Sequence, residues 1–220
     1  MNRGEKGLKM SNNLLRFENN LYLLADFETE NLNLCQQNRP WNLGFILFNN
    51  KEILEKHSYY IWWDDLKMSD GAAKATRFNY ENYKRKAKPQ KEVYDIWQKY
   101  LYRDDLIKVM HNGINFDAYI EQIWRHENQL KTNYNFLNNF IDTNSLAKAW
   151  KLGIKSIKRE EWLENWYKYA NYVRKGLKSS LTVLSKDLSI PFDLETLHDA
   201  SNDCILNKLI FEQLIYKIDI

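Results

Sequence analysis

The fold of this chain is decided by the stretch Leu21-Tyr22-Leu23-Leu24-Ala25-Asp26-Phe27-Glu28-Thr29. An apolar run of strand length ends there in two carboxylates that are separated by one residue. Because residues i and i+2 of a strand point to the same side, Asp26 and Glu28 can converge on one site. Unpaired buried carboxylates are costly, whereas divalent cations prefer oxygen ligands. The stretch alone also fits a solvated strand end, so a metal site requires further acids elsewhere in the chain.

The composition indicates a globular protein with enough apolar material for a sizeable core. Of the 220 residues 44% are hydrophobic and 28% are charged, and the aromatic residues include 8 Trp, 14 Tyr and 10 Phe. A net charge of +3 is compatible with a polyanionic partner but does not require one. We expect one domain over residues 1–220, with an N-terminal extension at 1–20 and a helical insertion at 151–178.

Cysteine usage and hydropathy indicate a reducing compartment. Cys35 and Cys204 are the only cysteines, and their separation supports neither a disulfide framework nor a cysteine zinc site. Residues 1–6 are not followed by the apolar region of a signal peptide, and no stretch approaches the roughly 20 apolar residues of a membrane span. We therefore expect a cytoplasmic protein that has no membrane partner.

The apolar periodicity predicts a mixed sheet covered by helices. Strands are expected at 21–27, 43–48, 53–63, 106–110 and 136–141. Residues 64–90 are mixed and polar, and helices are expected from Pro89 onward, at 116–126, after Asp142-Thr143, through much of 151–178, at 181–188 and at 200–217. Three strands in meander followed by strand–helix alternation are typical of an α/β fold.

Two further acids are candidates to share a site with Asp26 and Glu28. Asp117 begins the helix after strand 106–110, and Asp203 lies at the start of the last helix, five residues after His198. Each acid is also explained by the favourable interaction of a carboxylate with a helix N-terminus. His198 taken alone fits a surface loop histidine.

The ordered set of these residues resembles a known family. Asp26-x-Glu28-Thr29, then Asn112-x-x-Asn115-Phe116-Asp117, then His198 with Asp203 resemble the three motifs of the DEDDh 3′–5′ exonucleases. This DnaQ-like family of the ribonuclease H-like superfamily includes the proofreading subunit of bacterial replicative polymerases and the oligoribonucleases. The resemblance spans roughly residues 21–215. It implies a ribonuclease H-like mixed sheet, with the first three strands antiparallel and the later ones parallel.

The resemblance also implies a mechanism. Asp26, Glu28, Asp117 and Asp203 would hold two Mg²⁺ or Mn²⁺ ions, one orienting the attacking water and the other stabilising the leaving 3′ oxygen. His198, with an ordinary pKa near neutrality, would take the proton from that water. Family analogy further implies that Thr29 contacts the 3′-terminal nucleotide, that Leu32 wedges against its base and that Asn112 helps to hold the scissile phosphate. Asp142 matches a structural position.

The expected partner is the 3′ end of a nucleic acid, with single-stranded DNA preferred and a DNA polymerase as a candidate partner in proofreading. Two alternatives stay open. One is an exoribonuclease acting on short RNA. The other is a catalytically inactive module that binds nucleic acid or docks on a polymerase, although mutually repelling carboxylates have no physical reason to persist in such a scaffold.

Residues 151–178 carry a second signal, because eight basic residues and several aromatic ones are interleaved there with three glutamates. Such a pattern suits single-stranded nucleic acid, through phosphate neutralisation and base stacking. It also fits an amphipathic helix whose aromatic residues pack in the core. The basic cluster at 84–88 reads more simply as a solvated face.

Overall fold

The computed structural model describes residues 15–34 and 37–220, so Cys35 and most of the expected N-terminal extension lie outside the described residues. Its sheet has the strand order β4-β3-β2-β1-β5-β6. The strands are β1 (Leu21–Thr29), β2 (Pro40–Phe48), β3 (Ile53–Trp62), β4 (Lys88–Pro89), β5 (Leu106–Met110) and β6 (Phe140–Asp142). The first three pair antiparallel, and β1–β5 and β5–β6 pair parallel. The expected mixed sheet is confirmed.

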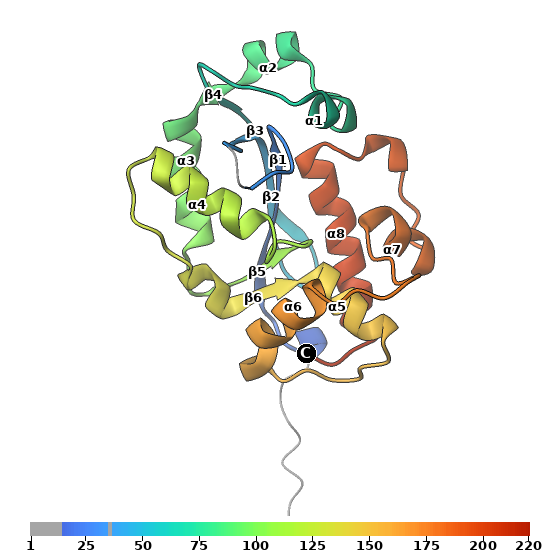
Figure 1. The fold of residues 1–220 in the computed structure, drawn as a ribbon. Coiled ribbons are helices and arrows are strands. Elements are labelled where there is room, and N and C mark those ends of the chain that lie inside the picture. The colour runs from blue at the N-terminus through green and yellow to red at the C-terminus, as the bar shows by residue number, and fades with distance from the viewer. Residues whose placement is uncertain (1–14, 35–36) are drawn as a thin grey trace, which may run out of the picture.

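Helices cover both faces of this sheet, with α3 and α4 on one side and α8 on the other (Figure 1). The helices are α1 (Asp70–Ala75), α2 (Tyr80–Lys86), α3 (Gln90–Leu101), α4 (Asp117–Glu127), α5 (Thr143–Lys151), α6 (Trp162–Ala170), α7 (Leu181–Asp187) and α8 (Ala200–Leu214). Short 3-10 turns are η1 (Leu15–Phe17), η2 (Asn135–Asn139), η3 (Arg159–Glu161) and η4 (Leu194–Thr196). Among the described residues, no helix is long and apolar enough to cross a membrane.

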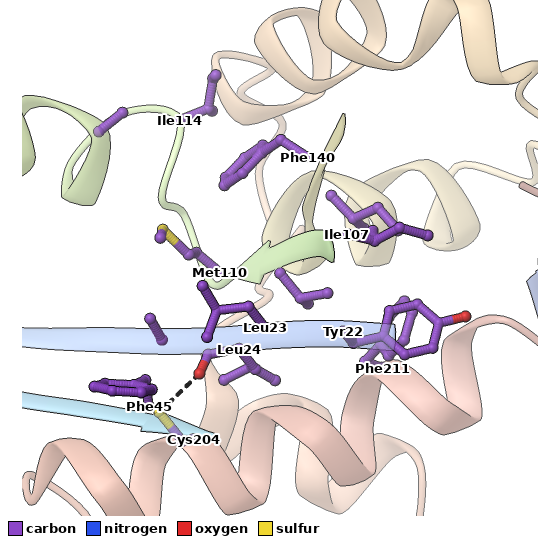
Figure 2. Close-up of a cluster of buried hydrophobic side chains, with 14 of the residues drawn as sticks. Tyr22, Leu23, Leu24, Phe45, Ile107, Met110, Ile114, Phe140, Cys204 and Phe211 are labelled. Atoms are coloured by element: carbon purple, nitrogen blue, oxygen red, sulfur yellow. Dashed lines mark hydrogen bonds between the residues drawn. The ribbon is translucent and has the colours of Figure 1, made fainter. Parts of the chain in front are cut away.

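The two-residue alternation of β1 sends its side chains to opposite helical layers. Tyr22 packs edge-on against Phe211 of α8, with ring centroids 5.2 Å apart. Phe27, on the other face, packs against Trp97 of α3 at 5.7 Å. Figure 2 shows Tyr22 and Phe211 in one buried cluster. Because Asp26 lies an even number of residues after Tyr22, its carboxylate points to the α8 side of the sheet.

Two aspartates begin the helices that close this side. Asp142 is the N-cap of α5 and accepts a hydrogen bond from the Ser145 amide at 2.8 Å. Asp199 is the N-cap of α8 and accepts from the amides of Ser201 and Asn202. Each bond satisfies an N–H group that the helix itself leaves unpaired.

Two sequence-based expectations about local structure were wrong, those for 136–141 and 151–178; one region proved to hold elements that had not been named, and one helix is shorter than expected. Residues 136–141 form η2 and the end of a short strand, because Asn133 and Asn139 bond the backbone with their side chains and compete with a sheet ladder. The polar region 64–90 contains α1, α2 and β4. In 151–178 the only helical segments are η3 and α6, and α8 ends at Leu214, three residues earlier than expected.

Candidate active site

Carboxylates from three elements converge where β1 ends. Single ligand atoms of Glu28, His198 and Asp203 lie within 4.8 Å of one another. The amide of His198 donates to both carboxylate oxygens of Asp203 at 3.3 Å, which ties the loop before α8 to its first turn. His198 adopts a left-handed backbone conformation, with φ 70°, and its side chain is exposed. The structure thus brings together residues of the first and third motifs.

The second motif joins the same cluster from β5. This strand pairs parallel with β1, so α4 begins beside the end of β1. Asp117 is 4% exposed and its carboxylate accepts hydrogen bonds from its own amide and from that of Phe27. Asp117 therefore contacts the backbone between Asp26 and Glu28, and all four acids of the three motifs share one site.

Two residues of β2 that the sequence analysis did not single out place α8 against the acids. Gly44 lies opposite Asp26 in the antiparallel ladder, and a Cβ atom there would stand 2.3 Å from the carbonyl carbon of Ala200. Asn42, opposite Glu28, accepts a hydrogen bond from the amide of Ala200 at 3.2 Å. The available signal was Gly44 itself, because a glycine inside a strand marks a close backbone approach.

Burial, together with neighbouring carboxylates, raises the pKa values of the four acids. Burial, followed by the charges of Asp203 and Asp117, raises the pKa of Glu28 to about 8. The same causes, in the same order, raise the pKa of Asp26 well above its ordinary range. Burial raises the pKa values of Asp117 and Asp203 to about 7, although backbone amides oppose the change in both.

Salt bridges of the described residues leave this cluster unpaired. Within residues 15–34 and 37–220, no lysine, arginine or histidine forms a salt bridge with Asp26, Glu28, Asp117 or Asp203. Buried charges are normally paired or bound to metal ions. A set of hard oxygen donors that form no salt bridge with the described residues fits Mg²⁺ or Mn²⁺. His198 is exposed at the edge of this set, which leaves space there for a bound ligand.

These pKa shifts predict how stability depends on pH and metal. Because the folded carboxyl groups hold protons more tightly than the unfolded ones, the metal-free protein loses stability as pH rises from about 4 to about 8. We expect Mg²⁺ or Mn²⁺ to raise the melting temperature clearly at pH 8 and little at pH 5.5, where protons compete for the ligands. Thermal melting in EDTA and in metal at both pH values checks this. An equal rise at both pH values would contradict it.

Thr29 is the last residue of β1, and Leu32 lies in the loop that follows. The Thr29 hydroxyl donates to the backbone oxygen of Asn31 at 2.7 Å, whereas the Leu32 side chain is 85% exposed. Leu32 lines a pocket of about 780 Å³ together with residues 67–69. The structure thus places Leu32 at an open pocket, whereas the Thr29 hydroxyl is hydrogen-bonded within the turn that follows β1.

A buried ion pair between Arg39 and Glu30, which the sequence did not predict, lies next to this pocket. Arg39 contacts Glu30 at 2.8 Å, and the two side chains are 4% and 1% exposed. Glu30 also accepts from the amides of Arg39 and Lys67, both at 2.8 Å. These bonds join Glu30, the residue after β1, to Arg39 before β2 and to the segment after β3.

Asn112 occupies the turn before α4. Its backbone has φ 62°, a left-handed conformation that asparagine tolerates well, and its side-chain oxygen accepts from Asn144 at 3.0 Å. Asp142 is fully buried and accepts from the amide of Ile114 in the same loop at 3.1 Å. Both residues shape the loop that presents Asp117.

Comparison with known proteins gives a match in structure and none in sequence. No protein-family model matches the chain, and no curated protein matches it. The solved structure of Escherichia coli exonuclease I in complex with a dA16 oligonucleotide superposes with a TM-score of 0.71 at 16% identity, covering 90% of this chain and 41% of that one. Apo exonuclease I gives a TM-score of 0.70 at 15% identity, covering 91% and 43%. The zinc-bound form of the E. coli enzyme with single-stranded DNA gives 0.70 at 15%, covering 90% and 40%.

These superpositions establish the fold. The chain has the ribonuclease H-like architecture expected from its three motifs, and its resemblance to the DEDDh exonucleases is confirmed at the level of the fold. It spans about two fifths of the length of the solved chains that it matches.

Proposed function

We propose that this chain is a metal-dependent 3′–5′ exonuclease that acts on single-stranded nucleic acid. The observation that carries the proposal is the convergence of Glu28, His198 and Asp203 within 4.8 Å, beside the buried Asp26 and Asp117. The structurally similar exonuclease I has been solved with oligonucleotides and with zinc, which supports the same class of substrate and a divalent cation here.

The charge of the site explains why a cation is needed. An anionic strand is repelled by four carboxylates unless cations neutralise them. Bound Mg²⁺ or Mn²⁺ would supply acidification of water and stabilisation of the leaving oxygen. Asp26, Glu28, Asp117 and Asp203 would hold these ions, since they are the oxygen donors that the fold gathers there.

The protein's own groups would position the reactants. His198 is exposed beside Asp203, so its imidazole can accept the proton of the attacking water. The pocket beside Leu32 would receive the 3′-terminal nucleoside, in agreement with the role that family analogy implies. Binding at the chain end fits a site that lies at the end of β1, next to the buried ion pair of Glu30 and Arg39.

The test is hydrolysis of matched substrates. Single-stranded DNA and RNA of one sequence, labelled in the 3′-terminal nucleotide, are incubated with Mg²⁺, with Mn²⁺ and with EDTA. We expect labelled mononucleotide to be released only when metal is present. Faster release from dinucleotides of RNA would favour the exoribonuclease alternative. Strand binding without release would contradict the proposal and favour the inactive module. A DNA polymerase partner stays a prediction of the family resemblance.

A further inference from the structure

A groove rich in exposed tyrosine lies between α4, η2 and α6. It has a volume of about 490 Å³, and Tyr119, Tyr134, Leu163 and Tyr167 line it over a floor that includes Ile114 and Ala118. These four side chains are 38–41% exposed, whereas the floor residues are buried. In Figure 1, α6 lies below α4. We refer to this feature as the tyrosine groove.

The three aromatic rings of the tyrosine groove lie near one another, and no other aromatic ring of the described residues packs on them. The pKa values of Tyr134 and Tyr167 are raised by burial and then by the neighbouring Tyr119 hydroxyl, which places the rings in one cluster. Across the described part of the chain, none of the three takes part in a ring–ring contact such as Tyr22 makes with Phe48. Their faces are therefore free to stack on a planar ligand.

Helix α6 explains how the groove arises from the basic aromatic segment. Trp162, Trp166 and Tyr169 are buried, and the indole N–H of Trp166 donates to the Phe140 oxygen at 2.6 Å. Leu163 and Tyr167 lie one turn apart on the neighbouring flank of the helix and are exposed. The segment therefore packs one aromatic face into the core and presents another to solvent.

The tyrosine groove and the proposed active site lie on the same helix and the loop before it. Asp117 begins α4, and the groove is lined by Ala118 and Tyr119, which follow it directly, and by Ile114, three residues before it. A helix with its side chains is roughly 10–12 Å across. A strand whose 3′ end lies at Asp117 and that crosses α4 would reach the tyrosine groove.

The charge of this region suits a polyanion. Residues 151–178 contain eight lysines and arginines against three glutamates, whereas the whole chain has a net charge of +3. Lys168, next to Tyr167, is exposed, and so are Arg174 and Lys175. None of the three forms a salt bridge within residues 15–34 and 37–220. They are available to neutralise phosphates.

We propose that the tyrosine groove binds unpaired bases of the substrate strand upstream of its 3′ end, by stacking on Tyr119, Tyr134 and Tyr167. This inference rests on the proposed exonuclease function and specifies its substrate as single strands longer than a few nucleotides. Base–aromatic stacking tolerates any sequence, because every base has a flat face. Paired bases cannot stack in this way, and a dinucleotide does not reach the groove.

The test measures binding of a 5′-fluorescein-labelled dT12 strand and of a labelled dinucleotide by anisotropy in Mg²⁺, with a 3′-terminal linkage that resists hydrolysis in both ligands. We expect each of Tyr119→Ala, Tyr134→Ala and Tyr167→Ala to weaken dT12 binding about fivefold and to leave dinucleotide binding unchanged. The phenylalanine variants keep the ring and should bind dT12 as the wild type does. Tyr216→Ala is the control, since Tyr216 is 70% exposed and does not line the tyrosine groove.

Abasic nucleotides upstream of the 3′ end supply a readout that does not depend on protein folding. They should weaken binding to the wild-type protein and have no effect on the triple alanine variant. If the triple variant bound dT12 with wild-type affinity, the inference would be overturned. The exposed rings would then be explained by contact with another protein. If the wild type binds dT12 through the tyrosines but never releases nucleotides in metal, the exonuclease function fails while the tyrosine groove stands as a strand-binding surface.

Discussion

Replacing Asp26 by asparagine is expected to abolish hydrolysis while making the metal-free protein more stable. The substitution removes an oxygen donor from the centre of the cluster, so we expect turnover to fall by about three orders of magnitude. It also removes a carboxyl group whose pKa burial and the charges of Asp203 and Asp117 raise well above the ordinary range. The melting temperature in EDTA should therefore rise by several degrees at pH 8, at roughly 2–4 °C for each 1 kcal/mol.

The stability gain should shrink as pH falls and disappear only below about pH 4, where Asp26 is protonated in the unfolded chain as well as in the folded one. Two control variants separate the roles. His198→Ala should lower turnover steeply and keep the metal-dependent rise in melting temperature, because the acids remain. Asp104→Asn, at an exposed turn, should change neither quantity. Wild-type turnover in Asp26→Asn, or a lower melting temperature at pH 8, would contradict the assignment.

Replacing Gly44 by alanine is expected to disturb the site, because the added methyl group meets the backbone at the start of α8. The new Cβ atom would stand 2.3 Å from the carbonyl carbon and 2.4 Å from the next backbone nitrogen of α8, so the helix must move. Overpacking of this kind costs roughly 1–3 kcal/mol. A shift of about 1 Å in Asp203 and His198 should also lower turnover by roughly a hundredfold. Urea unfolding and turnover of Gly44→Ala measure the two effects.

The chain offers a matched control for this substitution. Gly71 lies in α1, and a Cβ atom there would meet nothing within 4 Å. Gly71→Ala should therefore leave turnover unchanged and stabilise the helix by roughly 0.5–1 kcal/mol. If Gly44→Ala were as stable and as active as Gly71→Ala, the close approach of α8 to β2 would not be what positions Asp203.

The local pattern of apolar residues was a good guide to the central strands and a poor guide to the periphery. β1, β2, β3 and β5 are where the periodicity predicted them, because each buries at least part of its length in one core. In residues 64–90 the pattern indicated no element before Pro89, and in 151–178 it indicated more helix than is present. Their short helices are set by tertiary contacts, such as Tyr83 donating to the Ile61 oxygen at 2.8 Å, which leave little trace in periodicity.

The candidate site shows the same division. Asp26, Glu28, Asp117, His198 and Asp203 could be named from their order along the chain and their resemblance to three motifs. Asn42, Gly44 and the Glu30–Arg39 pair could not, because their roles depend on partners that are distant in sequence or lie on another strand.

By itself, the sequence determined the strand that carries Asp26 and Glu28, the mixed sheet and the set of acids, since these follow from local periodicity and motif order. Only the tertiary structure decided that the acids meet in a buried place, where burial and then their mutual charges raise the pKa values of Asp26 and Glu28. It also decided that Tyr167 faces solvent beside Tyr119 while Trp166 is buried. The physical reason is that burial and charge coupling are properties of neighbours in space, and a sequence specifies those neighbours only once the chain has folded.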